Sequence, residues 1–326
     1  MTEMQTHNER ATNASHHAPP TTMTARVAVG VCTYKRPAWL QRTLEHIVQA
    51  GRQVNESLLI IVVDNDGNDT AVRAVVDQFA AHRHVAVRYR IEKQPGISAA
   101  RNAVFAEAHD AGVQLLAMVD DDEWPAPSWL AELLRVQQES RATVVGGPVL
   151  AVFSEAAAAM RKYAFFWSVD KQVIDGRPFV FAAGNFLIDL KAIADVPRPL
   201  FDDALGLAGG EDTMFFRGLF QRGHAMAWAQ AATVYEEVPD SRATLTWLRP
   251  RRFRVGNSAV RAESAGGAGT RSFLKTLGLT VRLVFYPALG REPGARLLGW
   301  LLEWDKVRGR YAAHLGRMVL EYARPG

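Results

Sequence analysis

Short apolar runs rich in β-branched residues alternate, over residues 26–150, with segments whose apolar positions recur every three to four residues. The short runs predict strands, which are Val27–Cys32, Leu58–Val63, Val85–Ile91, Gln114–Val119 and Thr143–Leu150. The periodic segments predict helices, which are Pro37–Ala50, Thr70–Ala81, Ile97–Ala111 and Pro127–Glu139. Continuously apolar strands separated by helices indicate an α/β fold, with a mostly parallel sheet covered by helices on both faces.

The alternation weakens in residues 151–256, where aromatic and glycine-rich segments replace it. In order, these are the aromatic stretch Tyr163–Trp167, the apolar run Phe179–Ala182, Gly184 with Asn185, the apolar run Phe186–Ile188, the turn Gly206–Gly210, and Glu211 with Asp212 at the start of a helix that ends near Gln221. This half is expected to form a second lobe that completes a pocket begun by the first. The pocket is expected at the carboxyl ends of the strands, because open α/β sheets bind ligands there.

Two stretches after residue 256 have the pattern of basic amphipathic helices. In the first, an apolar stripe of Leu274, Leu277, Val281, Val284 and Phe285 accompanies Arg271, Lys275 and Arg282 on another face. In the second, an apolar stripe of Leu297, Trp300, Leu301, Trp304, Tyr311, Leu315 and Met318 accompanies Arg296, Glu303, Arg310 and Arg317. Such helices either lie on an anionic membrane surface or pack against the rest of the chain, and the pattern leaves both open.

The composition excludes several classes of protein. Of the 326 residues, 48% are apolar and 22% are charged, which excludes wholesale disorder and collagen-like repeats. The single cysteine, Cys32, excludes an internal disulfide and a cysteine-rich zinc site, and it favours a reducing, cytoplasmic setting.

The net charge of +4 is unevenly distributed. Residues 249–326 contain 15 Lys or Arg and 5 Asp or Glu, a net of +10, whereas residues 1–248 contain 23 and 29, a net of −6. A basic end on an acidic body indicates a polyanionic partner for that end, either a membrane surface or phosphorylated ligands. The acidic body argues against nucleic acid, whose binding depends on neutralising phosphates.

Neither end of the chain predicts a membrane-spanning segment. Residues 1–24 are polar and lack the apolar stretch of a signal peptide, so they are expected to form a disordered leader. The most apolar later segment, Phe273–Gly290, is interrupted by Lys275 and Arg282, whereas a span needs roughly 20 nearly uncharged residues.

Four consecutive carboxylates, Asp120–Glu123, follow the predicted strand Gln114–Val119. Their mutual repulsion at the end of a buried strand is costly unless a cation compensates it. Mg²⁺ characteristically takes one or two carboxylates together with substrate phosphates. The alternative is a solvated turn before a helix that Pro125 and Pro127 would begin. We favour a functional site, because strand-end loops concentrate such sites.

Polar turns also follow the first and second predicted strands, at the same edge as the acidic run. They are Thr33–Pro37 and Asp64–Thr70. Asp64 could accept hydrogen bonds from a nucleobase or ribose, although Asp, Asn and Gly are also the ordinary residues of tight turns. After the third strand, Gly96 permits a ligand to approach the backbone, and the helix that follows favours negative charge at its start. The segment matches neither a P-loop nor a dinucleotide-binding fingerprint, and Arg101 in it is by itself expected to be a surface charge.

Six short motifs occur in a characteristic order within residues 26–256. They are Thr33-Tyr34-Lys35-Arg36, Val63-Asp64-Asn65, Pro95-Gly96 with Ala100-Arg101-Asn102, Asp120-Asp121-Asp122, Gly146-Gly147-Pro148 and Gly210-Glu211-Asp212. Each is weak alone, but their order resembles glycosyltransferase family 2, in particular the succinoglycan-type glucosyltransferases of bacterial exopolysaccharide synthesis. The resemblance implies a GT-A fold over residues 25–256, with a nucleotide half (residues 25–150) and an acceptor half (residues 151–256). A basic amphipathic helical region, residues 257–326, would follow.

The resemblance also implies an activity and a set of site residues. The reaction would be an inverting transfer, dependent on Mg²⁺ or Mn²⁺, of a sugar from a nucleotide-diphosphate donor, usually a UDP-sugar, to an acceptor hydroxyl. Asp122, with Asp120, would bind the metal in a DxD-type motif, and Asp212 would be the catalytic base. The other implied donor-binding residues are Thr33, Tyr34, Arg36, Asp64, Asp66, Gly96, Arg101, Asn102, Asp121 and Arg252, while Glu211, Gly184 and Asn185 would surround the base and the acceptor. Arg252 belongs to a run of arginines after Trp247, namely Arg249, Arg251, Arg252 and Arg254. One or two of them could reach the donor diphosphate, and the alternative is a solvated basic helix face.

The chemistry explains these residue types independently of the family. Breaking the bond between sugar and phosphate places negative charge on the departing nucleotide diphosphate, and a divalent cation stabilises that charge as a Lewis acid. A base on the opposite face of the sugar must take the proton of the attacking hydroxyl, and a carboxylate is adequate. From the pattern alone, Glu211 and Asp212 are explained equally well as acids that favour the first turn of a helix.

One departure from the family concerns the metal. Many members have a histidine ligand after the strand that follows the base helix, where this chain has Glu236 and Glu237. Either a glutamate replaces that histidine, or the aspartates and the phosphates hold the metal alone.

The implied acceptor is a glycan or a polyprenyl-diphosphate-linked sugar. A lipid-linked acceptor favours peripheral attachment of the basic helices to the cytoplasmic face of the cell membrane. Two other functions fit parts of the pattern. A metal-dependent nucleotidyltransferase needs a similar sheet and aspartate pair, but the loop that would grip a triphosphate near residue 35 is missing. A non-catalytic peripheral membrane protein would use the acidic turns only as helix caps.

Overall fold

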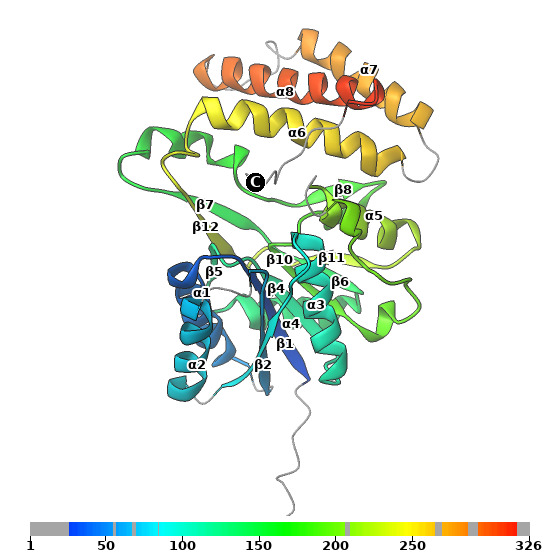
Figure 1. Ribbon diagram of the computed structural model, residues 1–326. Coiled ribbons are helices and arrows are strands. Elements are labelled where there is room, and N and C mark those ends of the chain that lie inside the picture. Colours follow the sequence, from blue (N-terminus) through cyan, green and yellow to red (C-terminus); the bar gives the residue numbers. More distant parts are fainter. Residues whose placement is uncertain are drawn as a thin grey trace, which may run out of the picture.

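The computed structural model describes residues 26–54, 57–66, 70–83, 85–205, 209–264, 269–285 and 293–317. The predicted leader, residues 1–24, lies outside the described residues, as does Met318 of the second apolar stripe. In Figure 1 a twisted sheet with helices on both faces forms the lower body, and three long helices form a separate layer above it.

The central sheet has seven strands in the order β11-β6-β10-β4-β1-β2-β3. Their bounds are β1 Val27–Thr33, β2 Leu58–Asp64, β3 Ala86–Ile91, β4 Leu115–Val119, β6 Val144–Gly146, β10 Asn185–Asp189 and β11 Met226–Trp228. All neighbouring pairs are parallel except those that β10 forms with β4 and β6. The predicted mostly parallel α/β sheet is therefore confirmed.

Helices cover both faces of this sheet because successive strand side chains point in opposite directions. Val27, Val29 and Val31 of β1 pack in one apolar cluster with the helices α1 (Pro37–Gly51), α2 (Thr70–Arg83) and α4 (Trp129–Ser140). Ala28 and Cys32 pack in the opposite cluster with α3 (Ile97–Asp110) and α5 (Glu211–Gln221). The side chains of β1, β2 and β4 are almost completely buried on both faces, which explains their continuously apolar sequences, whereas those of the edge strand β3 are partly exposed.

The prediction of one strand over Thr143–Leu150 is wrong. The structure has two strands there, β6 and β7 (Val149–Phe153), separated at Gly147 and Pro148. Pro148 has no amide hydrogen for a ladder, and a Cβ on Gly147 would overlap the Ala232 carbonyl oxygen. The chain therefore leaves the central sheet, and β7 joins a three-stranded sheet with β5 (Glu123–Pro125) and β12 (Val234–Val238).

Short elements connect these sheets. They are the 3₁₀ helices η1 (Ala158–Phe166), η2 (Lys191–Ile193) and η3 (Asp203–Leu205), and the hairpin of β8 (Gln172–Ile174) and β9 (Arg177–Phe179). The aromatic stretch predicted at Tyr163–Trp167 largely belongs to η1, and Trp167 packs edge-on against Phe153 of β7. The second half of the chain is therefore anchored to the smaller sheet.

Three helices form the upper layer in Figure 1: α6 (Leu245–Ser264), α7 (Gly269–Phe285) and α8 (Pro293–His314). The helices α6 and α8 touch backbone to backbone. A Cβ on Gly256 would overlap the Lys306 carbonyl oxygen, and a Cβ on Gly309 would overlap the Phe253 carbonyl oxygen. The expected boundary between the catalytic and C-terminal regions, after residue 256, falls inside α6.

Ion pairs also join the three helices. Arg310 of α8 is 1% exposed, and it donates to Glu263 of α6 at 2.6 Å, while Lys275 of α7 donates to the same carboxylate at 2.6 Å. On α6, Arg249 pairs with Asp305 of α8 at 2.8 Å. One side of α8 therefore packs against the rest of the chain, while Leu297, Trp304 and Leu315 of its predicted apolar stripe are exposed. None of the described helices is long and apolar enough to cross a membrane.

The buried Glu263 makes the stability of this layer depend on pH. Burial opposes its charge, but hydrogen bonds from Arg310, Lys275 and Ser272 lower the pKa of Glu263 from 4.5 to about 2. A lowered pKa in the folded state stabilises the protein above pH 4.5, and this stabilisation is lost as the pH falls towards 2. Glu263→Gln should thus lower the free energy of unfolding by roughly 3 kcal/mol at pH 7, because Arg310 loses its buried counter-ion.

Urea unfolding of the wild-type protein and Glu263→Gln at neutral and acid pH measures this effect. The difference between the two should shrink steadily below pH 4.5. The exposed pair of Glu139 with Arg135 supplies the control, because Glu139→Gln should change stability by less than about 1 kcal/mol. An unfolding difference for Glu263→Gln that stays constant with pH would contradict the assignment.

Candidate active site

A pocket of about 660 Å³ lies where the carboxyl ends of the central strands meet α5 and the start of α6. The strands end together because β1 and β2 are parallel and in register, so that Thr33 lies beside Asp64. The strand β10 is antiparallel, and its first residue, Asn185, therefore pairs with Val119 at this same edge. The predicted site residues that line the pocket are Thr33, Tyr34, Arg36, Gly96, Arg101, Asp120, Asp121, Asp122, Gly184, Glu211 and Asp212.

The acidic run after β4 is held by residues at the end of β1 and just after it. Thr33 donates its hydroxyl to Asp121 at 2.8 Å, and Arg36 donates to Asp121 at 3.0 Å and to Asp122 at 2.8 Å. Asp121 is buried, and burial raises its pKa to about 6 even though Arg36 opposes that shift. The acidic run is therefore an anchored part of the pocket wall, and the interpretation as a solvated turn does not describe it.

Arg101 connects the two walls of the pocket. It lies on α3, is 5% exposed, and forms ion pairs with Asp120 at 3.5 Å and with Glu211 of α5. The interpretation of Arg101 as a surface charge is thus wrong. Its burial is tolerated because two carboxylates neutralise it, and these carboxylates together with Asp212 raise its pKa above the ordinary value despite burial.

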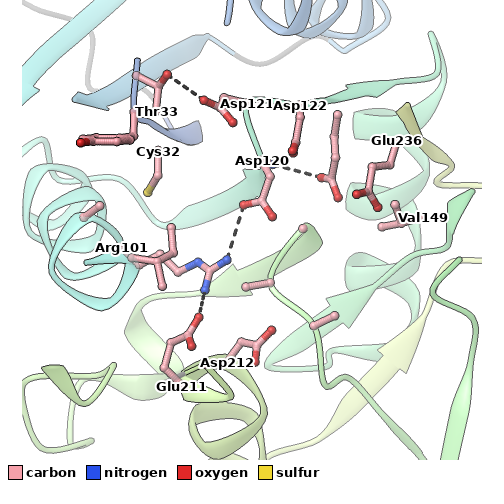
Figure 2. A pocket seen from close by; sticks show the side chains of 18 of the residues that line it. Cys32, Thr33, Arg101, Asp120, Asp121, Asp122, Val149, Glu211, Asp212 and Glu236 are labelled. Atoms are coloured by element: carbon pink, nitrogen blue, oxygen red, sulfur yellow. Dashed lines mark hydrogen bonds and ion pairs between the residues drawn. The ribbon is translucent and has the colours of Figure 1, made fainter. Parts of the chain in front are cut away.

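Asp212 faces the acidic run from the opposite wall. Figure 2 shows Glu211 and Asp212 on one side of the pocket and Asp120, Asp121 and Asp122 on the other. Gly210 precedes α5 with a φ of 89°, which favours glycine, and it brings the two acids into the first turn of the helix. Glu211 turns towards Arg101, whereas Asp212 accepts a hydrogen bond from the Thr213 amide at 2.6 Å and lines the pocket.

A second acidic pair comes from the smaller sheet. Glu123 of β5 and Glu236 of β12 are direct cross-strand partners, and both line the pocket. Burial, followed by the charge of Asp122, raises the pKa of Glu236 to about 7. Glu237 points elsewhere and pairs with Arg42 at 2.8 Å. Of the two glutamates that could replace a histidine ligand, the structure brings Glu236 to the pocket.

Glu123 has a positioning role within this wall. Its carboxylate accepts the Asp120 amide at 3.0 Å, and burial with the charges of Asp120 and Glu236 raises the pKa of Glu123 well above its ordinary value. A Cβ on Gly184 would overlap the Glu123 carboxylate, so Gly184 leaves the space that this side chain needs.

Three predicted site residues near the nucleotide half do not line the pocket. Asp64 is fully buried and accepts from the Tyr89 hydroxyl at 2.8 Å and from the Asp66 amide at 2.9 Å. Asp66 lies 3.5 Å from Lys35, and Asn102 bonds to the Phe201 backbone at 2.8 and 3.0 Å. These side chains organise the loops behind the pocket wall.

Two more predicted residues lie away from the pocket. Asn185 bonds to the Trp129 indole and to the carbonyl oxygens of Pro148 and Ala232, which ties the two sheets together. Arg252 turns towards α8, where it pairs with Glu303. The structure therefore does not bring Arg252 to the donor side of the pocket.

Two pocket residues, Arg242 and Trp167, were not predicted, and Arg251 is the member of the arginine run after Trp247 that reaches the pocket in place of Arg252. Arg242 and Arg251 line the pocket near Glu236, and each guanidinium lies over the ring of Trp247, at 5.9 and 5.0 Å from its centroid. Trp167 also lines it, and its indole nitrogen has no hydrogen-bond partner within the described structure. The arginine-rich segment after Trp247 was a signal for Arg251, but nothing in the sequence pattern singled out Arg242.

The pocket carries a net negative charge. Seven carboxylates and four arginines line it. Such an excess of carboxylates suits a divalent cation with oxygen ligands. Within the described ranges, no three His, Cys, Asp or Glu side chains converge as a ready metal site. The donor set thus fits an Mg²⁺- or Mn²⁺-type site with few protein ligands, in which substrate phosphates complete the coordination.

Comparison with known proteins identifies relatives in sequence. The family model "Glycosyl transferase family 2" matches residues 28–196. The succinoglycan biosynthesis protein ExoM of Rhizobium meliloti (strain 1021) is 34% identical over 246 residues, which are 75% of this chain and 78% of that protein.

Solved structures resemble the fold. The mannosyltransferase PcManGT from Pyrobaculum calidifontis, in complex with GDP-Man and Mn²⁺, aligns with a TM-score of 0.57 and 15% identity over 91% of this chain and 89% of its own. GalNAc-T7 with UDP, GalNAc and Mn²⁺ aligns with a TM-score of 0.54 and 14% identity over 89% of this chain and 56% of its own. At these identities the likeness concerns the fold, which is the GT-A fold.

Proposed function

Because the chain belongs to glycosyltransferase family 2, we propose that it transfers a sugar, with inversion, from a nucleotide-diphosphate donor to a hydroxyl group of a lipid-linked or oligosaccharide acceptor. The expected donor is a UDP-sugar, and the expected product is a bacterial exopolysaccharide of the succinoglycan type. The observation that supports this proposal most strongly is the position of Asp212, which faces the strand-end carboxylates across a pocket of about 660 Å³. Pockets of this size accommodate a ligand as large as a nucleotide sugar.

Asp212 is the proposed base. Its carboxylate takes the proton of the acceptor hydroxyl while that oxygen attacks the anomeric carbon of the sugar. Attack comes from the face opposite the departing nucleotide, so the anomeric configuration inverts. Glu211 is not the proposed base, because its carboxylate forms an ion pair with Arg101. The ion pair between Arg101 and Glu211 keeps the first turn of α5 in place, and it thereby orients the neighbouring Asp212.

The divalent cation would be held by Asp122 and Asp120 together with the donor phosphates, while Glu236 lines the pocket nearby. When bound, it supplies Lewis-acid stabilisation of the negative charge that develops on the nucleotide diphosphate. Arg36 orients Asp122 through their 2.8 Å ion pair. The raised pKa of Glu236 reflects repulsion by Asp122 and burial, and it indicates a place where positive charge is favourable.

The nucleoside is proposed to lie at the other end, against Thr33, Tyr34, Gly96 and Arg101, which all line the pocket. Asn65 shapes this end: its side chain donates to the Gln94 carbonyl at 2.7 Å and accepts from the Gly96 amide at 2.9 Å. In this proposal, Asp64 supports the turn behind the nucleoside through Tyr89 instead of contacting the ligand.

Arg251, rather than Arg252, is proposed to bind the donor diphosphate. Arg251→Ala should raise the Kd for the nucleotide about tenfold or more, because a charge-assisted hydrogen bond is lost. Arg252→Ala is the matched control: it should leave this Kd within about twofold but lower the Tm, since Arg252 pairs with Glu303. Calorimetric titration with UDP and Mn²⁺ measures both. The reverse result would return the role to Arg252.

A thermal-shift screen of UDP-, GDP- and dTDP-sugars, with and without Mn²⁺, tests the proposed function. A donor that binds the folded protein should raise its Tm, and the rise should need the cation. The donor found is then incubated with a lipid-linked oligosaccharide, and the anomeric configuration of the product is read by NMR. Retention of configuration would overturn the inverting mechanism, and release of pyrophosphate from a nucleoside triphosphate would instead indicate a nucleotidyltransferase.

A further inference from the structure

The helix α7 packs against its neighbours through only a narrow stripe. Its buried residues are Ser272, Thr276 and Leu283. Thr276 accepts from Arg310 of α8 at 2.9 Å, and the Leu283 carbonyl oxygen accepts from the Trp300 indole at 3.1 Å. Beside this stripe, Lys275 pairs with Glu263 of α6, Thr280 hydrogen-bonds to the Tyr311 hydroxyl of α8 at 2.9 Å, and the Phe273 ring packs edge-on against His314. The side of α7 opposite the stripe is exposed.

The outward side of α7 is apolar over its length. The exposed fractions are 44% for Phe273, 61% for Leu274, 47% for Leu277, 56% for Val281, 73% for Val284 and 63% for Phe285. Because each residue advances by about 100° around a helix, these six occupy one continuous arc of about 120°. Soluble monomers rarely expose contiguous large apolar side chains, and such patches mark interaction surfaces.

Basic side chains border this arc on one side. Arg271, Lys275 and Arg282 are exposed, and their positions fall between the apolar arc and the buried stripe. The described helix contains no Asp or Glu. An apolar face beside a basic edge is the composition of helices that lie in the surface of an anionic bilayer.

We propose that α7 docks this face into the interfacial region of an anionic phospholipid membrane, with the helix axis parallel to the surface. Phe273, Leu277 and Val284 would enter the acyl boundary, and Arg271 and Arg282 would contact lipid phosphates. A second copy of the chain suits the face less well, because pairing two α7 helices would bring Arg271 and Arg282 of both copies together without an acid on either helix.

The arrangement of the molecule agrees with this docking mode. In Figure 1 α7 is the outermost helix of the upper layer, on the side away from the central sheet. The pocket lining includes Arg251 of α6 but no residue of α7, so contact of α7 with a membrane would not involve the pocket wall. The inference goes beyond the proposed sugar transfer and does not depend on it.

Co-sedimentation of the full chain with phosphatidylcholine vesicles, with and without phosphatidylglycerol, tests the proposal. The wild-type protein should bind the vesicles that contain phosphatidylglycerol and be released by high salt. Leu277→Glu combined with Val281→Glu, at the centre of the arc, should lower the partition coefficient about tenfold or more. Arg271→Gln combined with Arg282→Gln should lower it about tenfold for the anionic vesicles only.

The control places the same charges on other exposed apolar residues. Leu150→Glu combined with Val173→Glu, which are 40% and 57% exposed in the wild-type protein, should bind like the wild type. Equal vesicle binding by the α7 glutamate variant and the wild type would overturn the proposal. A second result would also overturn the proposal: light scattering shows that the wild-type protein is a dimer and that the α7 glutamate variant is a monomer. In that case a second copy of the chain, and not a membrane, would cover the face. Since no nucleotide sugar is present, failure here leaves the proposed transfer reaction unaffected.

Discussion

Asp212→Asn should lower the rate of sugar transfer by about 10²- to 10⁴-fold and leave the affinity for the donor unchanged. The substitution keeps the size of the side chain and an oxygen that can accept the Thr213 amide at the helix start. It removes the carboxylate that takes the acceptor proton. Binding of the donor should persist, because Arg36, Arg101 and the Asp120–Asp122 wall remain in place.

Steady-state transfer assays and calorimetric titration with the donor measure the two quantities separately. Asp170→Asn is the matched control, because exposed Asp170 also accepts the amide of the next residue, at 2.7 Å, but lies outside the pocket lining. Its transfer rate should equal that of the wild type. If Asp212→Asn transfers sugar at the wild-type rate, then Asp212 is not the base and its place at the start of α5 is structural.

Asp122→Asn should reduce transfer by at least about 10²-fold and weaken the effect of Mn²⁺ on donor binding. The metal is expected to stabilise the departing diphosphate in the transition state by several kcal/mol. Each 1.36 kcal/mol lost from this stabilisation lowers the reaction rate about tenfold. Without Asp122, only Asp120 remains of the two proposed carboxylate ligands, which is too few to hold the cation with the donor phosphates.

Titration of Mn²⁺ against the thermal stability of the donor complex provides the measurement. Removal of the cation from the wild-type protein with a chelator should reproduce the defect, and added Mn²⁺ should restore the wild type but not Asp122→Asn. Asp77→Asn, which breaks an exposed pair with Arg73, controls for the loss of an ion pair and should respond like the wild type. If the thermal stability of the donor complex depends on Mn²⁺ in Asp122→Asn as it does in the wild type, then Asp122 is not a metal ligand.

Much of the pocket was predictable because strand ends meet at one edge of a parallel sheet. This prediction needs only the strand boundaries, which continuously apolar sequences mark well. From these boundaries, Thr33 and the acidic run after β4 were expected to lie close together. The order of the motifs then indicated that Asp212 belonged opposite them.

Contacts that depend on register or helix rotation were not predictable in this way. Glu236 reaches the pocket and Glu237 does not because β12 pairs Glu236 with Glu123 and successive strand residues point in opposite directions. Arg251 and Arg252 are separated by about 100° around α6, so one faces the pocket and the other faces α8. The cluster of arginines in the sequence does not indicate which of Arg251 and Arg252 faces the pocket.

The break between β6 and β7 illustrates a further limit. The run Thr143–Leu150 is apolar and β-branched at both ends, but Gly146, Gly147 and Pro148 in its middle weaken or end a strand. This local signal predicts a break but not that the chain changes sheets there. The second part, β7, pairs with β12, which comes from residues far along the chain, and the sequence pattern does not identify that partner.

The glycine contacts between α6 and α8 bear on how the enzyme can be shortened for expression. Gly256 and Gly309 bring the two helices close enough that α8 covers one side of α6, while Arg251 of α6 supplies wall to the sugar-transfer pocket on another. A truncated protein that ends at residue 256, where the family resemblance ends, would stop in the middle of α6. It would lack α8, the helix that packs against α6. Such a product would keep Arg251, but we expect a shortened protein to need α8 in order to hold this side of the pocket in place.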